Sequence, residues 1–254
     1  MASVRVRDIV IGEGTPKICV PIVGKTSEEI VNEAVSFADL DLDLVEWRVD
    51  WFEGIEDTDA VIEVAKQLGE TLGADVPVLC TIRTAGEGGE AAIDVEHYCA
   101  LNRALISSGT VDLVDVELLL GDDVMTDLVA HAHEHGVAIV ASNHDFDATP
   151  TREEMIARLK HMQDLGADIL KIAVMPNSHR DVVELLAATE EMANDHATQP
   201  IVTMSMSGKG AISRMCGEVF GSAITFGCAS KASAPGQIDV NDLRTLLTLI
   251  HNAL

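Results

Sequence analysis

Eight apolar runs rich in β-branched residues alternate with amphipathic segments along the 254 residues of the chain. This alternation is typical of a parallel sheet with crossover helices, and eight repeats predict that the sheet closes into a (β/α)8 TIM barrel. No linker rich in proline, glycine or serine interrupts the pattern, so we expect one barrel domain over residues 1–254. The predicted strands cover residues 17–24, 44–50, 77–83, 113–118, 137–144, 169–176, 201–207 and 223–228.

Helix start signals fall between these runs. Thr26 followed by Glu29 and Thr151 followed by Glu154 match capping boxes, and Asp239 begins the last amphipathic segment, which is expected to close the barrel. The opening segment VRVRDIVIGEG, residues 4–14, predicts a short hairpin that plugs the bottom of the barrel, with a mobile arm as the alternative.

Charge and cysteine usage exclude several classes of function. The formal charge of −25, from 42 acidic and 17 basic residues, argues against nucleic acid as a partner and fits either a salt-adapted surface or an ordinary acidic enzyme. No apolar run reaches the roughly 18 residues of a membrane span, and no basic segment precedes an apolar core at the N-terminus. Five cysteines without a CxxC pair indicate reduced thiols. We therefore expect a cytoplasmic protein with no membrane partner.

A lysine interrupts the apolar run DILKIAVMP, residues 168–176. Such a run predicts a strand buried on both faces, so Lys171 projects into protein. A buried ammonium either finds a counter-charge or loses its proton and becomes a nucleophile suited to Schiff-base chemistry. The alternative is a lysine whose stem packs while its head reaches solvent.

Charged residues gather at the predicted carboxyl ends of the second and third strands, where barrel active sites lie. In LVEWRVD the two-residue period puts Glu46, Arg48 and Asp50 on one inward face, so that Glu46 and Arg48 either pair with each other or hold a polar ligand. The third strand ends with Arg83 and a glycine-rich loop that lets Glu87 turn back toward the barrel mouth. That loop lacks the spacing of a dinucleotide fingerprint.

Histidines occur in two places. His144 ends the fifth strand beside Asp145 and Asp147, where a carboxylate can fix its tautomer, and we predict that it is the general acid and base. His131 and His135 are four residues apart at a helix end. We interpret them as solvated side chains rather than metal ligands, since no carboxylate pattern for zinc accompanies them.

The last quarter of the chain predicts an anion site. Arg214 falls in the first turn of the helix after the seventh strand, where it can bind a carboxylate. Lys209, in SGKG, lacks the surroundings of a phosphate loop and is predicted to be loop charge. The polar loop from Ser233 to Gln237 can close over a ligand.

Seven segments together resemble the type I 3-dehydroquinate dehydratase family, the Schiff-base lyases of the shikimate pathway. They are, in order, PIVGKT, LVEWRVDWF, TIRTAGEGGE, SNHDFDATP, DILKIAVMP, MSMSGKGAISR and KASAPGQI. The match extends over essentially the whole chain, and a set of this kind is far more specific than any one motif.

The resemblance implies a role for each candidate residue. Lys171 forms the imine, His144 moves protons and Glu87 positions His144. The resemblance also places Met204 and Met206 in the pocket, whereas strand period alone leaves open whether Ser205 and Ser207 point inward instead. The implied substrate-binding residues are Glu46, Arg48, Arg83, Met204, Met206, Arg214, Phe226, Ser233 and Gln237.

The implied reaction converts 3-dehydroquinate to 3-dehydroshikimate and water in aromatic amino acid biosynthesis. It requires no metal and no organic cofactor, because the lysine supplies the electron sink, and the family implies a homodimer. Two alternatives remain: a class I aldolase, which requires a phosphate site after the seventh and eighth strands, and a non-catalytic carboxylate-binding barrel in which Lys171 and Arg214 only supply charge.

Overall fold

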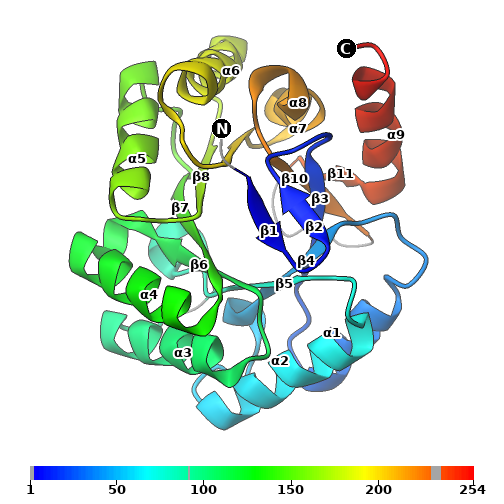
Figure 1. Ribbon diagram of the computed structural model, residues 1–254, viewed down its shortest axis with the longest axis vertical. Coiled ribbons are helices and arrows are strands. Elements are labelled where there is room, and N and C mark those ends of the chain that lie inside the picture. Colours follow the sequence, from blue (N-terminus) through cyan, green and yellow to red (C-terminus); the bar gives the residue numbers. More distant parts are fainter. Residues whose placement is uncertain (1–2, 91, 230–235) are drawn as a thin grey trace.

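A closed barrel of parallel strands forms the centre of the computed structural model, which describes residues 3–90, 92–229 and 236–254 (Figure 1). Backbone pairing runs in the order β11-β10-β3-β4-β5-β6-β7-β8-β9, and a bridge between Ile201 and Ser222 joins the two sides. The predicted (β/α)8 barrel is confirmed. Its strands are β3 (Lys17–Ile22), β4 (Leu44–Arg48), β5 (Val78–Thr81), β6 (Leu113–Glu117), β7 (Ala138–Asp145), β8 (Ile169–Val174), β9 (Ile201–Ser205) and β10 (Ile224–Cys228), with the short β11 (Ile238–Asp239) beside β10.

Helices follow the strands and form the outer ring seen in Figure 1. They are α1 (Ser27–Val35), α2 (Thr58–Leu72), α3 (Val95–Ser108), α4 (Asp122–His135), α5 (Arg152–Asp164), α6 (His179–Glu191), α7 (Ala211–Met215), α8 (Gly217–Phe220) and α9 (Val240–His251). No helix within the described ranges is long and apolar enough to cross a membrane.

The sequence signals located most of the element starts. Thr26 and Glu29 form the predicted capping box of α1, and Asp239 caps α9 by accepting hydrogen bonds from two backbone N–H groups. At α5 only half of the predicted capping box forms, in which Thr151 accepts the Glu154 N–H. The predicted strands extend too far at the barrel mouth, by one residue in β6 and by two residues in β3, β4, β5, β8 and β9. Short 3-10 turns beginning at Val49 and Leu118 take the chain out of the sheet there.

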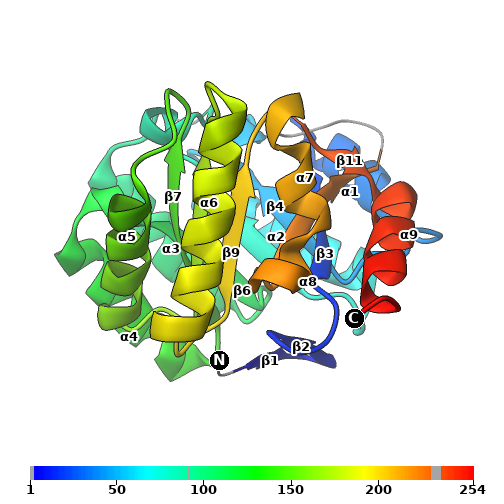
Figure 2. The same ribbon diagram turned by 90° about the horizontal axis from the view of Figure 1, so that it is seen from above.

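The N-terminal segment forms the predicted hairpin across the bottom of the barrel (Figure 2). Strands β1 (Val4–Val6) and β2 (Ile9–Ile11) pair antiparallel. Val6 and Ile11 are buried in one apolar cluster with the first inward residues of the barrel strands, among them Leu44 and Leu113. The hairpin therefore covers the apolar end of the barrel interior, opposite to the end where the charged residues lie.

Asp112 connects this hairpin to the barrel. Its Oδ1 pairs with Nε of Arg7 at 2.7 Å, while its Oδ2 accepts the Val78 N–H at 2.8 Å. Arg7 also donates to three backbone carbonyls of the α2–β5 loop at 2.8–3.1 Å. Asp43 and Asp168 similarly accept N–H groups from the neighbouring strand. The lower rim is thus held by aspartates that come directly before β4, β6 and β8.

Replacing Asp112 tests this anchoring. We expect Asp112→Ala to lower the free energy of unfolding by about 1–3 kcal/mol, because an ion pair is lost and a partly buried N–H loses its acceptor. The matched control is Asp127→Ala, which removes an exposed ion pair with Arg103. This variant is expected to change the free energy of unfolding by less than about 1 kcal/mol. Urea unfolding measures both, and equal losses would contradict the anchoring role.

Candidate active site

Polar side chains occupy the upper part of the barrel interior because alternate residues of each strand point inward. Above the apolar bottom layer the inward residues are Glu46, Thr81, Asp115, Ser142 and Lys171, and two residues further on they are Arg48, Arg83, Glu117, His144 and Ala173. All of these are buried except His144, which is partly exposed. The carboxyl ends of parallel strands meet at one rim, so these groups converge.

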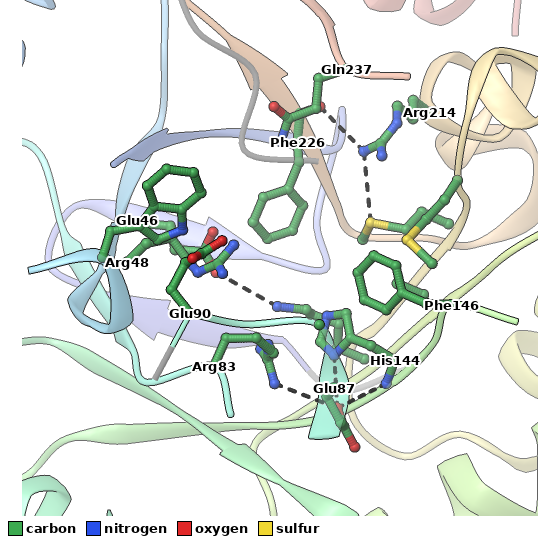
Figure 3. A pocket seen from close by; sticks show the side chains of 16 residues that line it. Glu46, Arg48, Arg83, Glu87, Glu90, His144, Phe146, Arg214, Phe226 and Gln237 are labelled. Carbon is green, nitrogen blue, oxygen red and sulfur yellow. Dashed lines mark hydrogen bonds and ion pairs between the residues drawn. The ribbon is translucent and has the colours of Figure 1, made fainter. Parts of the chain in front are cut away.

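A cavity of about 250 Å³ opens at this rim (Figure 3). Eleven of the twelve predicted site residues line it, and the twelfth, Ser233, lies outside the described residues. Five further residues line it that the sequence did not single out: Trp51, Gly88, Glu90, Phe146 and Ala173. The predicted residues that line it are Glu46, Arg48, Arg83, Glu87, His144, Lys171, Met204, Met206, Arg214, Phe226 and Gln237.

Lys171 is buried, with 2% of its surface exposed, as its apolar strand predicts. Its Nζ donates to Oδ2 of Asp115 at 2.9 Å and lies 3.7 Å from Oε1 of Glu46. The ammonium also lies 4.9 Å from the ring centre of Phe226. These two carboxylates supply the counter-charge that the sequence analysis gave as one outcome for a buried ammonium.

Asp115 joins Lys171 to a second cation. Its Oδ1 accepts hydrogen bonds from Arg83 at 2.7 Å and from the Ser142 hydroxyl at 2.6 Å. Burial alone would raise the pKa of this carboxyl, but Arg83 and Lys171 hold it below its ordinary value. Asp115 is therefore an ionised carboxylate at neutral pH, with no exposed surface and with both oxygens hydrogen-bonded.

Arg83 is surrounded by acidic groups from β6 and from the loop after β5. Besides Asp115 it contacts Glu117 at 2.9 Å and Glu87 at 3.5 Å. Glu117 in turn accepts the backbone N–H and hydroxyl of Thr84. A guanidinium keeps its proton at neutral pH. Arg83 therefore supplies a fixed positive charge between Lys171 and the Glu87 carboxylate.

Glu87 turns back into the barrel mouth as predicted. It ends the short turn η2 (Ala85–Glu87), and Gly88 follows in the left-handed region at φ 80°. A Cβ at Gly88 would collide with the Phe146 ring. The Glu87 Oε2 accepts the His144 N–H at 2.9 Å and lies 2.9 Å from its ring Nδ1. The carboxylate that holds His144 is therefore Glu87.

Asp145 has a different role from the one that the sequence suggested. It was placed beside the imidazole as a candidate partner, but its Oδ1 accepts the N–H groups of Asp147 and Ala148. It therefore shapes the loop after β7. That prediction is wrong because successive strand residues point to opposite faces.

Burial sets the protonation of the His144–Glu87 pair. It raises the pKa of Glu87 to about 7, against the opposing effect of Arg83. Burial, together with Arg83, Lys171 and Arg48, lowers the pKa of His144 well below its ordinary value. The imidazole is thus neutral at neutral pH. With its Nδ1–H donated to Glu87, its Nε2 carries the free lone pair that a general base requires.

Arg48 pairs with Asp50 rather than with Glu46. The two side chains make parallel hydrogen bonds, Nε to Oδ1 and Nη2 to Oδ2, both at 2.7 Å. Glu46 instead accepts the Thr81 hydroxyl at 2.8 Å and faces Lys171. The predicted alternative of a Glu46–Arg48 pair is therefore wrong. Both side chains line the cavity, at separate points on its wall.

Arg214 lies on the opposite wall from Glu87 (Figure 3). Only 1% of its surface is exposed, and its Nη1 contacts two neutral acceptors, the Met204 sulfur at 3.6 Å and the Phe226 carbonyl at 3.4 Å. Burial lowers the pKa of Arg214 to about 10. An anionic ligand beside this buried guanidinium would offset that cost, as the sequence predicts.

The strand-period ambiguity in β9 is resolved by the cavity. Met204 and Met206 line it, while the backbone N–H of Ser205 donates to the Ser213 hydroxyl at 2.9 Å. Lys209 donates to the Asn177 carbonyl at 3.1 Å and does not line the cavity, in agreement with a role as loop charge.

The histidines of α4 act as surface residues. His133 pairs with Asp168 at 3.0 Å, and His131 lies 2.9 Å from the Ser107 hydroxyl. No group of metal-ligating side chains occurs in the part of the chain that the structure describes. All five cysteines are free.

Besides Glu90, the sequence analysis missed three polar residues of the hydrogen-bond network around this site: Asp115, Glu117 and Asn143. The first two lie in LVDVE, where the two-residue period that located Glu46 and Arg48 also puts Asp115 and Glu117 on the inward face of β6. Asn143 gives no such signal, because it is on the outward face of β7 and reaches Glu87 only through the tertiary structure.

Fold and site together define a (β/α)8 barrel with a buried lysine–carboxylate pair and a histidine–glutamate pair at the carboxyl ends of its strands. Comparison with known proteins then identifies the family. Residues 18–253 match the family model of type I 3-dehydroquinase. The chain belongs to this family.

Relatives match over their whole length. A curated 3-dehydroquinate dehydratase of Salmonella agona is 53% identical, with 100% of both chains covered. A crystal structure of type I 3-dehydroquinate dehydratase from Clostridium difficile, with covalent modified comenic acid, is 50% identical with a TM-score of 0.97 and covers 100% of this chain and 99% of its own. The Geobacillus kaustophilus 3-dehydroquinate dehydratase is 40% identical with a TM-score of 0.95, covering 99% and 97%.

The raised pKa of Glu87, about 7 against an ordinary 4.5, predicts a pH-dependent cost to stability. The folded protein keeps this proton up to about pH 7 whereas the unfolded chain loses it near 4.5, so stability falls as pH rises between these values. Glu87→Gln cannot titrate. We expect the stability of this variant relative to wild type to improve by about 3 kcal/mol between pH 4.5 and pH 8.

Urea unfolding of both proteins across this pH range measures the effect, with Glu134→Gln on the exposed face of α4 as the control. Parallel stability curves for Glu87→Gln and wild type would show that Glu87 is already ionised in the folded protein near pH 5.

Proposed function

We propose that this chain is a 3-dehydroquinate dehydratase that eliminates water from 3-dehydroquinate through an imine on Lys171. The observation that carries the proposal is the burial of Lys171 in the cavity wall, with Asp115 and Glu46 beside its Nζ and a neutral His144 in the same cavity. The covalently modified comenic acid of the Clostridium difficile relative supports covalent chemistry in the family.

The cavity walls suggest how the substrate is oriented. Arg214, buried on one side, takes the substrate carboxylate, since a guanidinium binds a carboxylate through two parallel hydrogen bonds. The opposite wall presents Glu46, Arg48 and Arg83 to the hydroxyl and carbonyl groups of the ring. Met204, Met206 and Phe226 pack against its carbon skeleton, and Gln237 closes the site.

Imine formation requires a neutral amine. The Lys171 ammonium therefore transfers a proton to Nε2 of His144, and the neutral amine adds to the ring ketone. His144 returns this proton to the carbinolamine hydroxyl, which leaves as water and gives the iminium. The resulting iminium keeps a positive charge at the position where Asp115 and Glu46 already stabilise the ammonium. The two carboxylates thus favour the charged intermediate as well as the resting lysine.

His144 carries out the proton transfers of the elimination. Its Nε2 removes a proton from the carbon next to the iminium, and the electron pair moves into the iminium nitrogen. The imidazolium then returns the proton to the departing hydroxyl, which leaves as water, and the iminium charge is restored. Hydrolysis releases 3-dehydroshikimate and Lys171. Glu87 stabilises the imidazolium through its bond to Nδ1.

The chemistry of the iminium requires neither a metal nor an organic cofactor. The alternative of a non-catalytic barrel keeps the Lys171–Asp115 pair as a structural ion pair, and it differs from the proposal in predicting binding without turnover. The homodimer stays a prediction of the family resemblance, and the cytoplasmic location stays a prediction from cysteine usage.

Turnover of 3-dehydroquinate, followed by the absorbance of the conjugated enone product, tests the function. We expect wild type to form product and His144→Ala to lose about 10²-fold or more in kcat, because the general acid and base is absent while the lysine remains. The matched control is His135→Ala on the exposed end of α4, which is expected to keep full activity. Wild type that binds the substrate without forming product would refute the proposed function, and a fully active His144→Ala would remove the imidazole from it.

A further inference from the structure

A line of hydrogen bonds leads from the outer helix α5 to the Glu87 carboxylate. Asn143, on the outward face of β7 and 2% exposed, donates from Nδ2 to Oε1 of Glu87 at 3.0 Å. Its Oδ1 accepts a bond from Nη1 of Arg158 at 2.7 Å. Arg158 lies in the middle of α5, and its Nε donates to Glu154 on the same helix at 2.9 Å. None of Asn143, Arg158 and Glu154 lines the cavity.

The guanidinium determines which way the Asn143 amide points. Arginine has donors and no acceptor, so only the amide oxygen can face Arg158. The amide NH₂ is then directed at Glu87, and its N–H is the kind of partner that an ionised carboxylate requires. Without Arg158 the amide is free to rotate by 180°, which would set its oxygen against the carboxylate oxygen.

The other Oε atom of Glu87 holds His144, through both its backbone N–H and its ring Nδ1. One carboxylate therefore connects the amide and the imidazole. A change in the charge of Glu87 therefore alters the basicity of the His144 Nε2, and a change in its orientation alters the direction of the Nε2 lone pair.

We propose that Arg158 is a positioning residue for this pair: through the amide of Asn143 it favours the ionised form of Glu87 and aligns the carboxylate on His144, so that the helix layer helps to set the acid limb of the pH–rate profile. The kinetic consequence of this inference rests on the proposed function. Its structural basis is the set of three hydrogen bonds that join Arg158 to Asn143, Asn143 to Glu87 and Glu87 to His144.

The charges around Glu87 explain why one hydrogen bond matters there. Arg83, 3.5 Å away, favours the ionised form. Asp115 and Glu117 on β6 oppose it, as does burial, while the His144 imidazole is neutral. These effects bring the pKa of Glu87 to about 7, with the Asn143 bond lowering it. Glu87 is therefore close to half-protonated near neutral pH, where a small change in its surroundings alters its charge.

The first test is the pH dependence of kcat/KM. Losing or reversing the Asn143 bond is expected to move the acid limb upward by about 0.5–1 pH unit in Arg158→Met, the effect of one hydrogen bond on a protonation equilibrium. Arg158→Lys, which keeps a donor, is expected to restore most of the wild-type profile. Arg152→Met is the matched control, because it removes an exposed arginine of the same helix that pairs with Glu184.

A double-mutant cycle separates positioning from a general loss of stability. Asn143→Ala is expected to produce a shift similar to that of Arg158→Met, and the double variant is expected to shift no further, since both changes break one line of contacts. Additive shifts, or a shift in Arg152→Met equal to that of Arg158→Met, would overturn the proposal.

The second test needs no turnover. NMR of ring-¹⁵N histidine in the substrate-free protein reports the titration of the Glu87 carboxylate through the Nδ1 of His144. We expect its midpoint to rise in Arg158→Met by the same 0.5–1 pH unit. An unchanged midpoint would refute the positioning role of Arg158, whatever the activity of the variant. If wild type proves inactive but the midpoint still rises in Arg158→Met, the proposed function is refuted and the positioning role of Arg158 stands.

Discussion

One buried ion pair, Lys171 with Asp115, determines most of what surrounds it. Both side chains are almost inaccessible to water, so the loss of hydration of each charge has to be offset by the protein. Asp115 therefore also binds Arg83 and Ser142, and Arg83 in turn binds Glu117 and contacts Glu87. The network that stabilises the lysine thereby extends to the carboxylate that holds the histidine.

Barrel geometry makes this network possible. Parallel strands that direct every second residue inward bring side chains from β4 to β8 to one level, while the apolar layer and the β1–β2 hairpin below keep water from the other end. The two ends therefore have different physical tasks. Aspartates such as Asp112 hold the lower rim together, and the upper rim concentrates charges whose protonation depends on their burial.

The sequence predicted the fold and most of the site because both follow regular periods. Alternating runs located the eight strands, and the two-residue period placed Glu46, Arg48 and Arg83 inside. The same period applied to β6 would have found Asp115, the counter-charge of Lys171. The pairing of Arg48 with Asp50 and the contact of Asn143 with Glu87 depend on side-chain directions and loop paths that the period does not specify. Family resemblance, rather than strand period, selected the methionines of β9.

The most direct measurement of the imine on Lys171 is borohydride reduction in the presence of 3-dehydroquinate, followed by peptide mass analysis. We expect loss of activity and one ligand mass on the peptide containing Lys171, with none on the other six lysines and no capture by Lys171→Met. A label on Lys209 or Lys231, or turnover by Lys171→Met at the wild-type rate, would contradict the imine and with it the catalytic role of the buried ion pair.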